Sequence, residues 1–189
     1  MSQSTDQATL DDQSAKEEVY SLHELNHKKE AELLAIFKRG KLPSSMKSLD
    51  GNPVCLGLGV HILKGTLIDK GITRWARSNR FTWEGKSFRS SDDENGTGFN
   101  RLRSWYLGII TAFPFVTSIQ PSVIDGKDCI AIDYDLPVNP WYEQRIYDEL
   151  REISPGIFIG AVTLKRKKGY KLLCWFGVNT NSQEDHFWL

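Results

Sequence analysis

The residues best suited to polar chemistry lie in one segment of the chain, over residues 125–156. A turn opens the segment, and the strand that follows ends in Asp133. We expect residues 139–153 to form a short helix, with Asn139 as its N-cap and Pro140 in its first turn. This is where acids and arginines come together beside a strand, so it is the expected place for a polar site, and its charged residues are Arg145, Asp148, Glu149 and Arg151.

Two interpretations of these charges remain open. One is a set of ion pairs on the exposed face of the helix, each worth under about 1 kcal/mol. The other is that Arg145 turns toward Asp133, which strand alternation places on one face with Cys129 and Ala131. If that face lines a cavity, Asp133 needs a partner, because a lone buried carboxylate is strongly disfavoured. Arg145 is the nearest candidate in the sequence.

The run from His23 to His27 reads His-Glu-Leu-Asn-His, the spacing with which a helix can hold zinc between two imidazoles. A zinc enzyme of this kind needs a third ligand and a cleft around a buried helix. Glu30 and Glu32 are too close in the sequence to supply that ligand. We therefore interpret the run as the exposed face of an amphipathic helix over residues 21–39, and we expect no metal site.

Acid–base catalysis, if the protein is an enzyme, would depend on Asp133, Tyr134 or His61. His61 lies in an apolar run, where a histidine is more often a core residue than a base. Arg101 stands among aromatic residues over 100–106, where an arginine can bind a carboxylate or phosphate or can close a barrel.

The chain is rich in large aromatic residues, with six tryptophans and nine phenylalanines. Most such rings pack in cores, but rings also line the apolar cavities of small β-barrels. In the run from Trp83 to Phe88, a bulge at Gly85 would place both of these rings on one face. The candidates for contact with an apolar ligand are Trp83, Phe88, Phe113, Phe115 and Trp175, with Arg101 or Arg145 near a carboxylate-like head group.

Composition excludes several classes of function. Lys plus Arg and Asp plus Glu both number 24, so the protein has no net field that would attract nucleic acid. The three cysteines lie in apolar runs and indicate a reduced, cytoplasmic protein. Residues 1–18 are polar and acidic, unlike a signal peptide, and we expect them to be a disordered tail. No apolar run is long enough for an integral membrane segment. No motif calls for a cofactor.

The remaining chain, 19–189, is expected to fold as one mainly β domain. Short connections between successive strands favour an antiparallel barrel of the calycin or lipocalin type over a doubly wound fold. Besides the helix over 21–39 and the short helix over 139–153, we expect a polar loop over 90–98 and a hairpin at 166–169. The expected strands cover residues 54–68, 81–88, 109–120, 127–134, 156–165 and 170–178.

The layout resembles that of small lipocalin-like proteins of poorly known function. The resemblance rests on the N-terminal helix, the opening Leu49-Asp50-Gly51, the run from Trp83 to Phe88 and the pair Asn100-Arg101, and it covers residues 33–178. It implies a ligand cavity. The sequence therefore predicts a binding protein for a hydrophobic or amphipathic small molecule of the lipid, terpenoid or pigment class. The alternative is a small cofactor-free isomerase, cyclase or lyase that acts on such a molecule in the same cavity.

Overall fold

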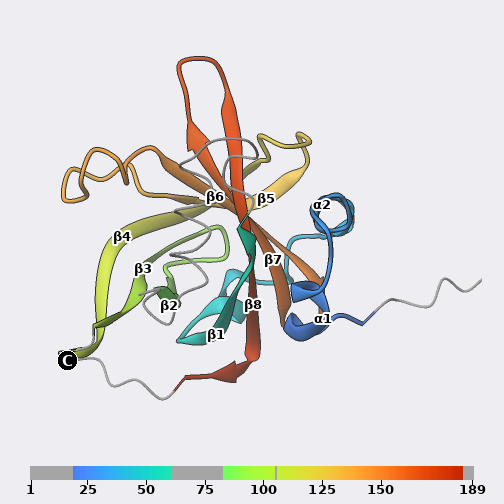
Figure 1. Ribbon diagram of the computed structural model, residues 1–189, viewed down its shortest axis with the longest axis horizontal. Helices are drawn as coiled ribbons and strands as arrows, with labels where there is room; N and C mark the ends of the chain where they lie inside the picture. The colour runs from blue at the N-terminus through green and yellow to red at the C-terminus, as the bar shows by residue number, and fades with distance from the viewer. Residues whose placement is uncertain (1–18, 61–82, 105, 185–189) are drawn as a thin grey trace, which may run out of the picture.

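The computed structural model describes residues 19–60, 83–104 and 106–184. These residues form eight antiparallel strands that curl into a nearly closed barrel (Figure 1). The fold class predicted from the sequence is confirmed. The strands are β1 (Pro53–Val60), β2 (Trp83–Ser90), β3 (Asn95–Ser104), β4 (Gly108–Pro121), β5 (Asp128–Asp133), β6 (Ile146–Ser154), β7 (Ile157–Lys165) and β8 (Tyr170–Gln183).

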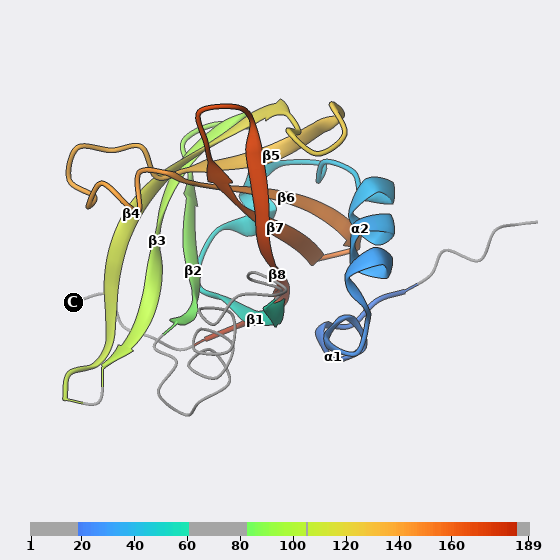
Figure 2. The ribbon, with the colours of Figure 1, turned by 45° about the horizontal axis from the view of Figure 1, so that its top comes forward.

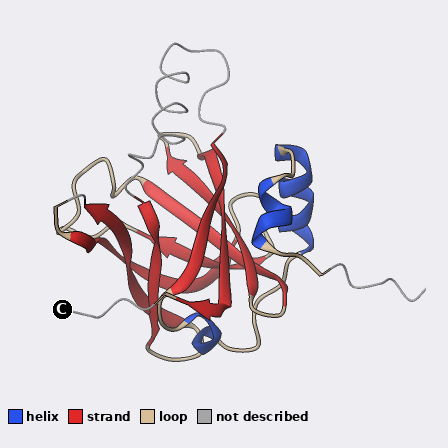
Figure 3. Ribbon diagram, turned by 60° about the horizontal axis from the view of Figure 1, so that its bottom comes forward, coloured by secondary structure: helices blue, strands red, loops and turns tan. Residues whose placement is uncertain are grey.

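The strands follow one another in a simple meander, with a single exception. From β2 to β8 each strand pairs with the next in the sequence, and β1 then pairs with the far side of β8. The edges formed by β1 and β2 contact each other. Figure 3 shows how the sheet curls. Among the described residues one bridge, between Gly51 and Phe88, joins these two edges. The barrel is therefore closed on seven sides by ladders and on the eighth by isolated contacts.

Strand alternation divides the apolar residues between the inside and the outside of the barrel. Side chains from every described strand except β1 and β3 dominate the inner core. Met46 and Leu49 of the 3-10 helix η1 (Met46–Leu49) complete it. Its other buried members are Phe88, Phe115, Ile130, Ile132, Tyr134, Leu150, Phe158, Phe176 and Val178.

A second core lies outside the barrel, where two helices cover part of the wall (Figure 2). These are α1 (Leu22–Asn26) and α2 (Glu30–Arg39), and Leu33, Ile36 and Phe37 of α2 are buried. Trp175 of β8 packs under α2, with its ring centroid 5.6 Å from that of Phe37. Neither α1 nor α2 nor any other described helix has the length and apolar character needed to cross a membrane.

Three elements differ from the sequence-based expectation. The helix expected over 21–39 is broken between α1 and α2. The polar loop expected over 90–98 is shorter, because β3, a strand that the sequence analysis did not predict, begins at Asn95. The helix expected over 139–153 is wrong, since residues 141–145 form a turn and β6 occupies the rest. Asn139 caps no helix there, and its side-chain amide donates to the carbonyls of Pro114 and Tyr134.

Candidate functional site

A buried polar cluster lies among the apolar side chains inside the barrel. It consists of Lys86 on β2, Asn100 on β3, Tyr134 just after β5 and Asp148 on β6. We call these four residues the interior cluster. The ammonium of Lys86 lies 2.9 Å from Oδ2 of Asp148 and donates at 3.1 Å to Oδ1 of Asn100. It also donates to the hydroxyl of Tyr134.

The strand geometry explains why these four side chains meet. A register shift between Trp83 and Gly85 returns Lys86 and Phe88 to the inner face, and Gly85 supports the shift with a positive φ of 147°. On β6 the alternation turns Asp148 inward between Ile146 and Leu150, two residues that also pack in the inner core. Residues from four separate strand regions thus converge on one point.

The remaining contacts tie the interior cluster together. The hydroxyl of Tyr134 donates to Oδ2 of Asp148 at 3.2 Å, and it accepts from the side-chain amide of Asn100 at 3.2 Å. The indole Nε1 of Trp83 donates at 3.0 Å to Oδ1 of Asn100. Each of the four members therefore bonds to at least two of the others.

Aromatic rings surround the buried ammonium. Nζ of Lys86 lies 5.9 Å from the ring centroid of Trp83, 5.4 Å from that of Phe115 and 5.1 Å from that of Phe176. The ring of Tyr134 is 5.0 Å away. Ring faces attract a cation, and the attraction grows when the cation is removed from water. The rings thus stabilise the charge of Lys86 and also form an apolar wall around it.

Burial and pairing shift the proton affinities of this cluster. Burial opposes the charged form of Lys86, but the carboxylate of Asp148 and the hydroxyl of Tyr134 outweigh it, so the pKa of Lys86 is raised. Burial raises the pKa of Tyr134, with Asp148 adding to the rise. Burial likewise raises the pKa of Asp148 above its ordinary value, and Lys86 opposes that rise. At neutral pH the lysine and the tyrosine both keep their protons.

One atom of the interior cluster accepts no hydrogen bond from the described part of the chain. Oδ1 of Asp148 is buried and accepts no hydrogen bond from the described residues, although Oδ2 of the same carboxylate accepts two. Asp148 as a whole is 1% exposed. A buried acceptor left without a donor costs about 1–3 kcal/mol, and more when it is charged. Oδ1 of Asp148 can therefore accept a hydrogen bond from one further donor.

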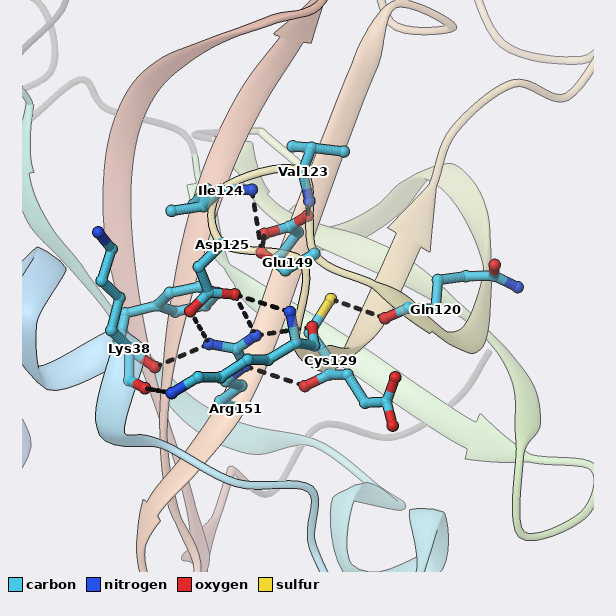
Figure 4. Close-up of polar contacts among 12 residues, drawn as sticks. Lys38, Gln120, Val123, Ile124, Asp125, Cys129, Glu149 and Arg151 are labelled. Atoms are coloured by element: carbon cyan, nitrogen blue, oxygen red, sulfur yellow. Dashed lines mark hydrogen bonds and ion pairs between the residues drawn. The ribbon is translucent and has the colours of Figure 1, made fainter.

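A second polar cluster lies on the outer wall of the barrel, under the β4–β5 turn (Figure 4). Glu149 accepts from the hydroxyl of Ser122 at 2.6 Å and from the backbone N–H of Val123. Arg151 forms a two-pronged pair with Asp125, at 2.7 and 2.8 Å, and donates to the backbone carbonyl of Phe37. These contacts fasten the turn and α2 to the wall, so we assign this cluster a structural role.

The expected pair between Asp133 and Arg145 does not form. Asp133 lies 2.6 Å from the ammonium of Lys165, and Arg145 is exposed and donates to the backbone carbonyl of Lys165. The face that carries Cys129 and Ala131 points away from the inner core, so Asp133 lies on the outside of the barrel. The expectation was wrong because alternation along β5 places Ile130 and Ile132 inside instead.

Two other residues expected to contact a ligand, Trp175 and Arg101, instead make contacts that stabilise the fold. Trp175 faces outward beneath α2, so its predicted place on a cavity wall is wrong. Arg101 is 1% exposed, and its guanidinium donates to the carbonyl of Lys86 at 2.6 Å and to that of Pro53 at 2.7 Å. These bonds cross the gap between β2 and β1, as expected of an arginine that closes a barrel.

The other predicted contact residues do lie with the inner core. Phe88 and Phe115 are buried members of it, and Trp83 and Phe113 are partly buried against it. Their contact with a ligand stays a prediction. Among the catalytic candidates, Tyr134 belongs to the interior cluster, whereas His61 lies outside the described residues.

The sequence analysis missed three of the four members of the interior cluster: Lys86, Asn100 and Asp148. A signal for Lys86 was present, because the predicted bulge at Gly85 puts that lysine on the face of Phe88. Asp148 was hidden by the helix predicted over 139–153, in which it lay on a solvated face. Asn100 was considered only as a neighbour of Arg101.

The side chains of His23 in α1 and of His27, its C-cap residue, are exposed, and the glutamate between them belongs to the helix cap. Glu24 accepts at 2.8 Å from both the backbone N–H and the hydroxyl of Ser21, which makes it part of a capping box. The rings of His23 and His27 lie beside each other, with Nε2 atoms 3.4 Å apart. In the part of the chain that the structure describes, no three acids, histidines or cysteines gather as a metal site would require.

A pocket of about 520 Å³ lies outside the barrel, between the end of α2 and the β6–β7 turn. Its charged lining residues, Arg39, Lys41 and Glu152, are exposed or half-exposed. Arg39 donates at 2.9 Å to the hydroxyl of Tyr20 in the same pocket. None of the buried polar atoms that lack a partner among the described residues belongs to its lining. The interior cluster is therefore the stronger candidate site.

Comparison with known proteins supports the fold and gives no information about the chemistry of the site. No protein-family model matches the chain, and no curated protein matches it either. A solved structure described as the crystal structure of a protein from Thermomonospora curvata is similar over 83% of this chain and 88% of its own. The TM-score is 0.51 and the sequence identity is 17%, a likeness that shows a shared barrel fold.

Proposed function

We propose that this protein binds an apolar or amphipathic small molecule, of the lipid, terpenoid or pigment class, inside its barrel. The interior cluster would hold the polar end of the ligand, and the rings of Trp83, Phe115 and Phe176 would contact its apolar body. Barrels of about eight strands have an interior that side chains can fill or that can hold one small ligand. The resemblance to lipocalin-like proteins points the same way.

The partnerless Oδ1 of Asp148 is the observation that carries this proposal. Burying an ion pair costs several kcal/mol per ion before the pairing is counted, and an apolar filling of similar volume is often at least as stable. A barrel core selected for stability alone therefore gains little from a buried lysine and aspartate. An unused charged acceptor beside them adds to the cost, and a ligand that donates to it would remove that cost.

Binding fits the interior cluster better than catalysis does. An isomerase, cyclase or lyase without a cofactor needs a side chain that exchanges a proton near neutral pH. The pKa of Lys86 and that of Tyr134 are both raised, so each of these groups keeps its proton. Burial also raises the pKa of Asp148, but its carboxylate is paired with the ammonium of Lys86 at 2.9 Å, which opposes protonation. We also propose a cytoplasmic location, because Cys55, Cys129 and Cys174 are all free thiols.

The experiment is a titration with N-phenyl-1-naphthylamine, a neutral apolar dye whose fluorescence rises in apolar surroundings. We expect saturable binding of one dye per chain. Val162 faces inward opposite Asp148, and Val162→Phe should weaken dye binding at least tenfold by filling that region. Val116→Phe is the matched control, because Val116 is 40% exposed on the outer wall.

Both variants must remain folded by circular dichroism for the comparison to count. Val116→Phe should bind the dye as the unchanged protein does. Absence of saturable binding to the unchanged protein, or equal loss in the two variants, would refute binding inside the barrel.

A further inference from the structure

The hydrogen bonds of the interior cluster define what kind of polar group can join it. A lysine ammonium has three N–H donors and no acceptor. Lys86 uses its three donors on Oδ2 of Asp148, the hydroxyl of Tyr134 and Oδ1 of Asn100. The cation therefore has no spare donor with which to bind an anionic head group.

The hydroxyl of Tyr134 is committed in the same way. Its one proton goes to Oδ2 of Asp148, while its oxygen accepts from Lys86 and from Asn100. What remains open is an acceptor, Oδ1 of Asp148, which receives no bond from the described residues. A ligand can therefore bond to this cluster by donating to Oδ1 of Asp148. It cannot accept from Lys86 or Tyr134, because the donors of both are already used.

Charge leads to the same requirement. Lys86 and Asp148 are 4% and 1% exposed at their side chains and neutralise each other at 2.9 Å. An anion would meet the unpaired oxygen of a carboxylate, and a cation would meet the ammonium of Lys86. A neutral group is repelled by neither charge. Such repulsion costs most at a buried site, where water does not screen it.

We propose that the ligand of this barrel presents a neutral hydrogen-bond donor, a hydroxyl or an amide N–H, to Oδ1 of Asp148. The proposal rests on the function proposed above and narrows it to alcohols, phenols and amides with a large apolar body. It replaces the carboxylate-like head group that the sequence suggested near Arg101 or Arg145. Arg101 is bonded to backbone carbonyls and Arg145 is exposed outside the barrel.

The test compares molecules that share a carbon skeleton and differ in one group. Farnesol, farnesoic acid and farnesyl methyl ether form one set, and 1-dodecanol, dodecanoic acid and 1-methoxydodecane form another. Each is measured by displacement of N-phenyl-1-naphthylamine at pH 7. Within each set we expect the alcohol to bind at least tenfold more tightly than the acid, which is charged, and the ether, which cannot donate.

A tyrosine variant tests whether Lys86 disfavours an anionic head group because all of its N–H donors are occupied. Tyr134→Phe removes the hydroxyl that occupies one N–H of Lys86, so the freed donor can serve a carboxylate. The preference for alcohol over acid should fall at least fivefold. Tyr147→Phe is the matched control on the outer face of β6, and it should leave the preference unchanged.

The outcomes separate this inference from the proposed function. If the dye does not bind, the function itself is refuted. If the dye binds but the acid or the ether competes as well as the alcohol, or none of the six displaces it, the donor requirement is refuted while ligand binding stands. A preference that Tyr134→Phe does not alter would show that Lys86 plays no part in excluding the acid.

Discussion

At the scale of single residues, Lys86 and Asp148 depend on each other. Removing one partner of a buried ion pair leaves an uncompensated charge, which typically costs about 3–5 kcal/mol. We expect Asp148→Ala to lower the free energy of unfolding by about that amount, as measured by urea denaturation. Lys86 would then lie among four rings without its carboxylate.

Asp133→Ala is the control for that measurement. Asp133 pairs with Lys165 at 2.6 Å, but their side chains are 35% and 25% exposed, so water screens the pair. Its loss should cost under about 1 kcal/mol. Equal effects of the two substitutions would contradict the role assigned to burial.

Asp125 should control the stability of the protein in acid. The hydrogen bonds from Arg151 lower the pKa of Asp125 to about 2 from an ordinary value of 3.8. A carboxylate whose pKa is lowered by folding stabilises the folded state above its ordinary pKa, and the stabilisation disappears as the pH falls through the lowered value. We therefore expect the free energy of unfolding to decline between about pH 4 and pH 2.

The variant Asp125→Asn isolates this effect. It should be less stable at pH 7 by about 1.5–3 kcal/mol, the usual contribution of a hydrogen bond to a charged group, and should lose less stability between pH 4 and 2. Burial raises the pKa of the neighbouring Glu149, so its contribution to the free energy of unfolding falls as the pH rises above 4.5. Glu149 therefore does not produce a loss of stability between pH 4 and pH 2. Parallel pH curves for the variant and the unchanged protein would refute the assignment.

Single residues also show how far the sequence could lead. The bulge at Gly85 was predictable because alternation fails there, and it is confirmed by the register shift between Trp83 and Gly85. Applied to Lys86, the same logic would have placed a cation inside the barrel. Its partner could not be found in this way, because Asp148 reaches it through folding and not through spacing along the chain.

At the scale of secondary-structure elements, the close contact between β7 and β8 depends on Gly160. A Cβ atom at this position would lie 2.2 Å from the ring of Phe176, a member of the inner core. We expect Gly160→Ala to displace that ring and to destabilise the fold by about 1–3 kcal/mol, the usual cost of overpacking. Urea denaturation would measure the loss.

The same substitution on β1 provides the comparison. A Cβ atom at Gly57 would meet nothing within 4 Å. Gly57→Ala should change stability by less than about 1 kcal/mol, and in the favourable direction, because alanine has less freedom to lose on folding. A larger loss at Gly57 than at Gly160 would contradict the packing argument.

The element between Asn139 and Ile153 was the principal error of the sequence analysis, for a physical reason. Its apolar residues fit a helical spacing, and its charges are spread over both faces of the strand, so no polar and apolar alternation marks β6. Buried charges on a strand are tolerated only when distant residues pair with them. Here Asp148 meets Lys86 and Arg151 meets Asp125, and neither pairing can be read from local pattern.

At the scale of the whole molecule, Arg101 should hold the two edges of the barrel together. Its guanidinium links the carbonyls of Pro53 and Lys86 across edges that share a single bridge among the described residues. We expect Arg101→Met to cost about 3 kcal/mol, because several buried acceptors lose their donor. Amide hydrogen exchange should speed up most in β1 and β2.

Arg103 on the same strand offers the matched control. It forms an ion pair with Glu84, but its side chain is 65% exposed. Arg103→Met should cost under about 1 kcal/mol and leave exchange in β1 unchanged. Faster exchange in β1 with both variants would show that the effect comes from β3 and not from the bonds of Arg101.

The antiparallel barrel could be predicted because short turns and strand-like runs dominate the chain. The hairpin expected at 166–169 lies between β7 and β8 as predicted. Closure by Arg101 was one of the alternatives that the sequence offered, but its partners could not be predicted, since Pro53 and Lys86 give no local sign of their link through it. Closure depends on a side chain that bonds to backbone carbonyls. Every residue has a carbonyl, so residue types do not indicate which ones will be its partners.

The pairing of β1 with β8 has a consequence for biosynthesis. The ribosome releases β1 early and β8 last, so a growing chain carries an unpaired β1 edge until nearly all of the domain has left the exit tunnel. Exposed strand edges of this kind attract other chains, and pairings that are distant in the sequence form slowly. The nascent domain is thus vulnerable to aggregation until β8 has left the exit tunnel and paired with β1, and chaperones would protect it during that interval.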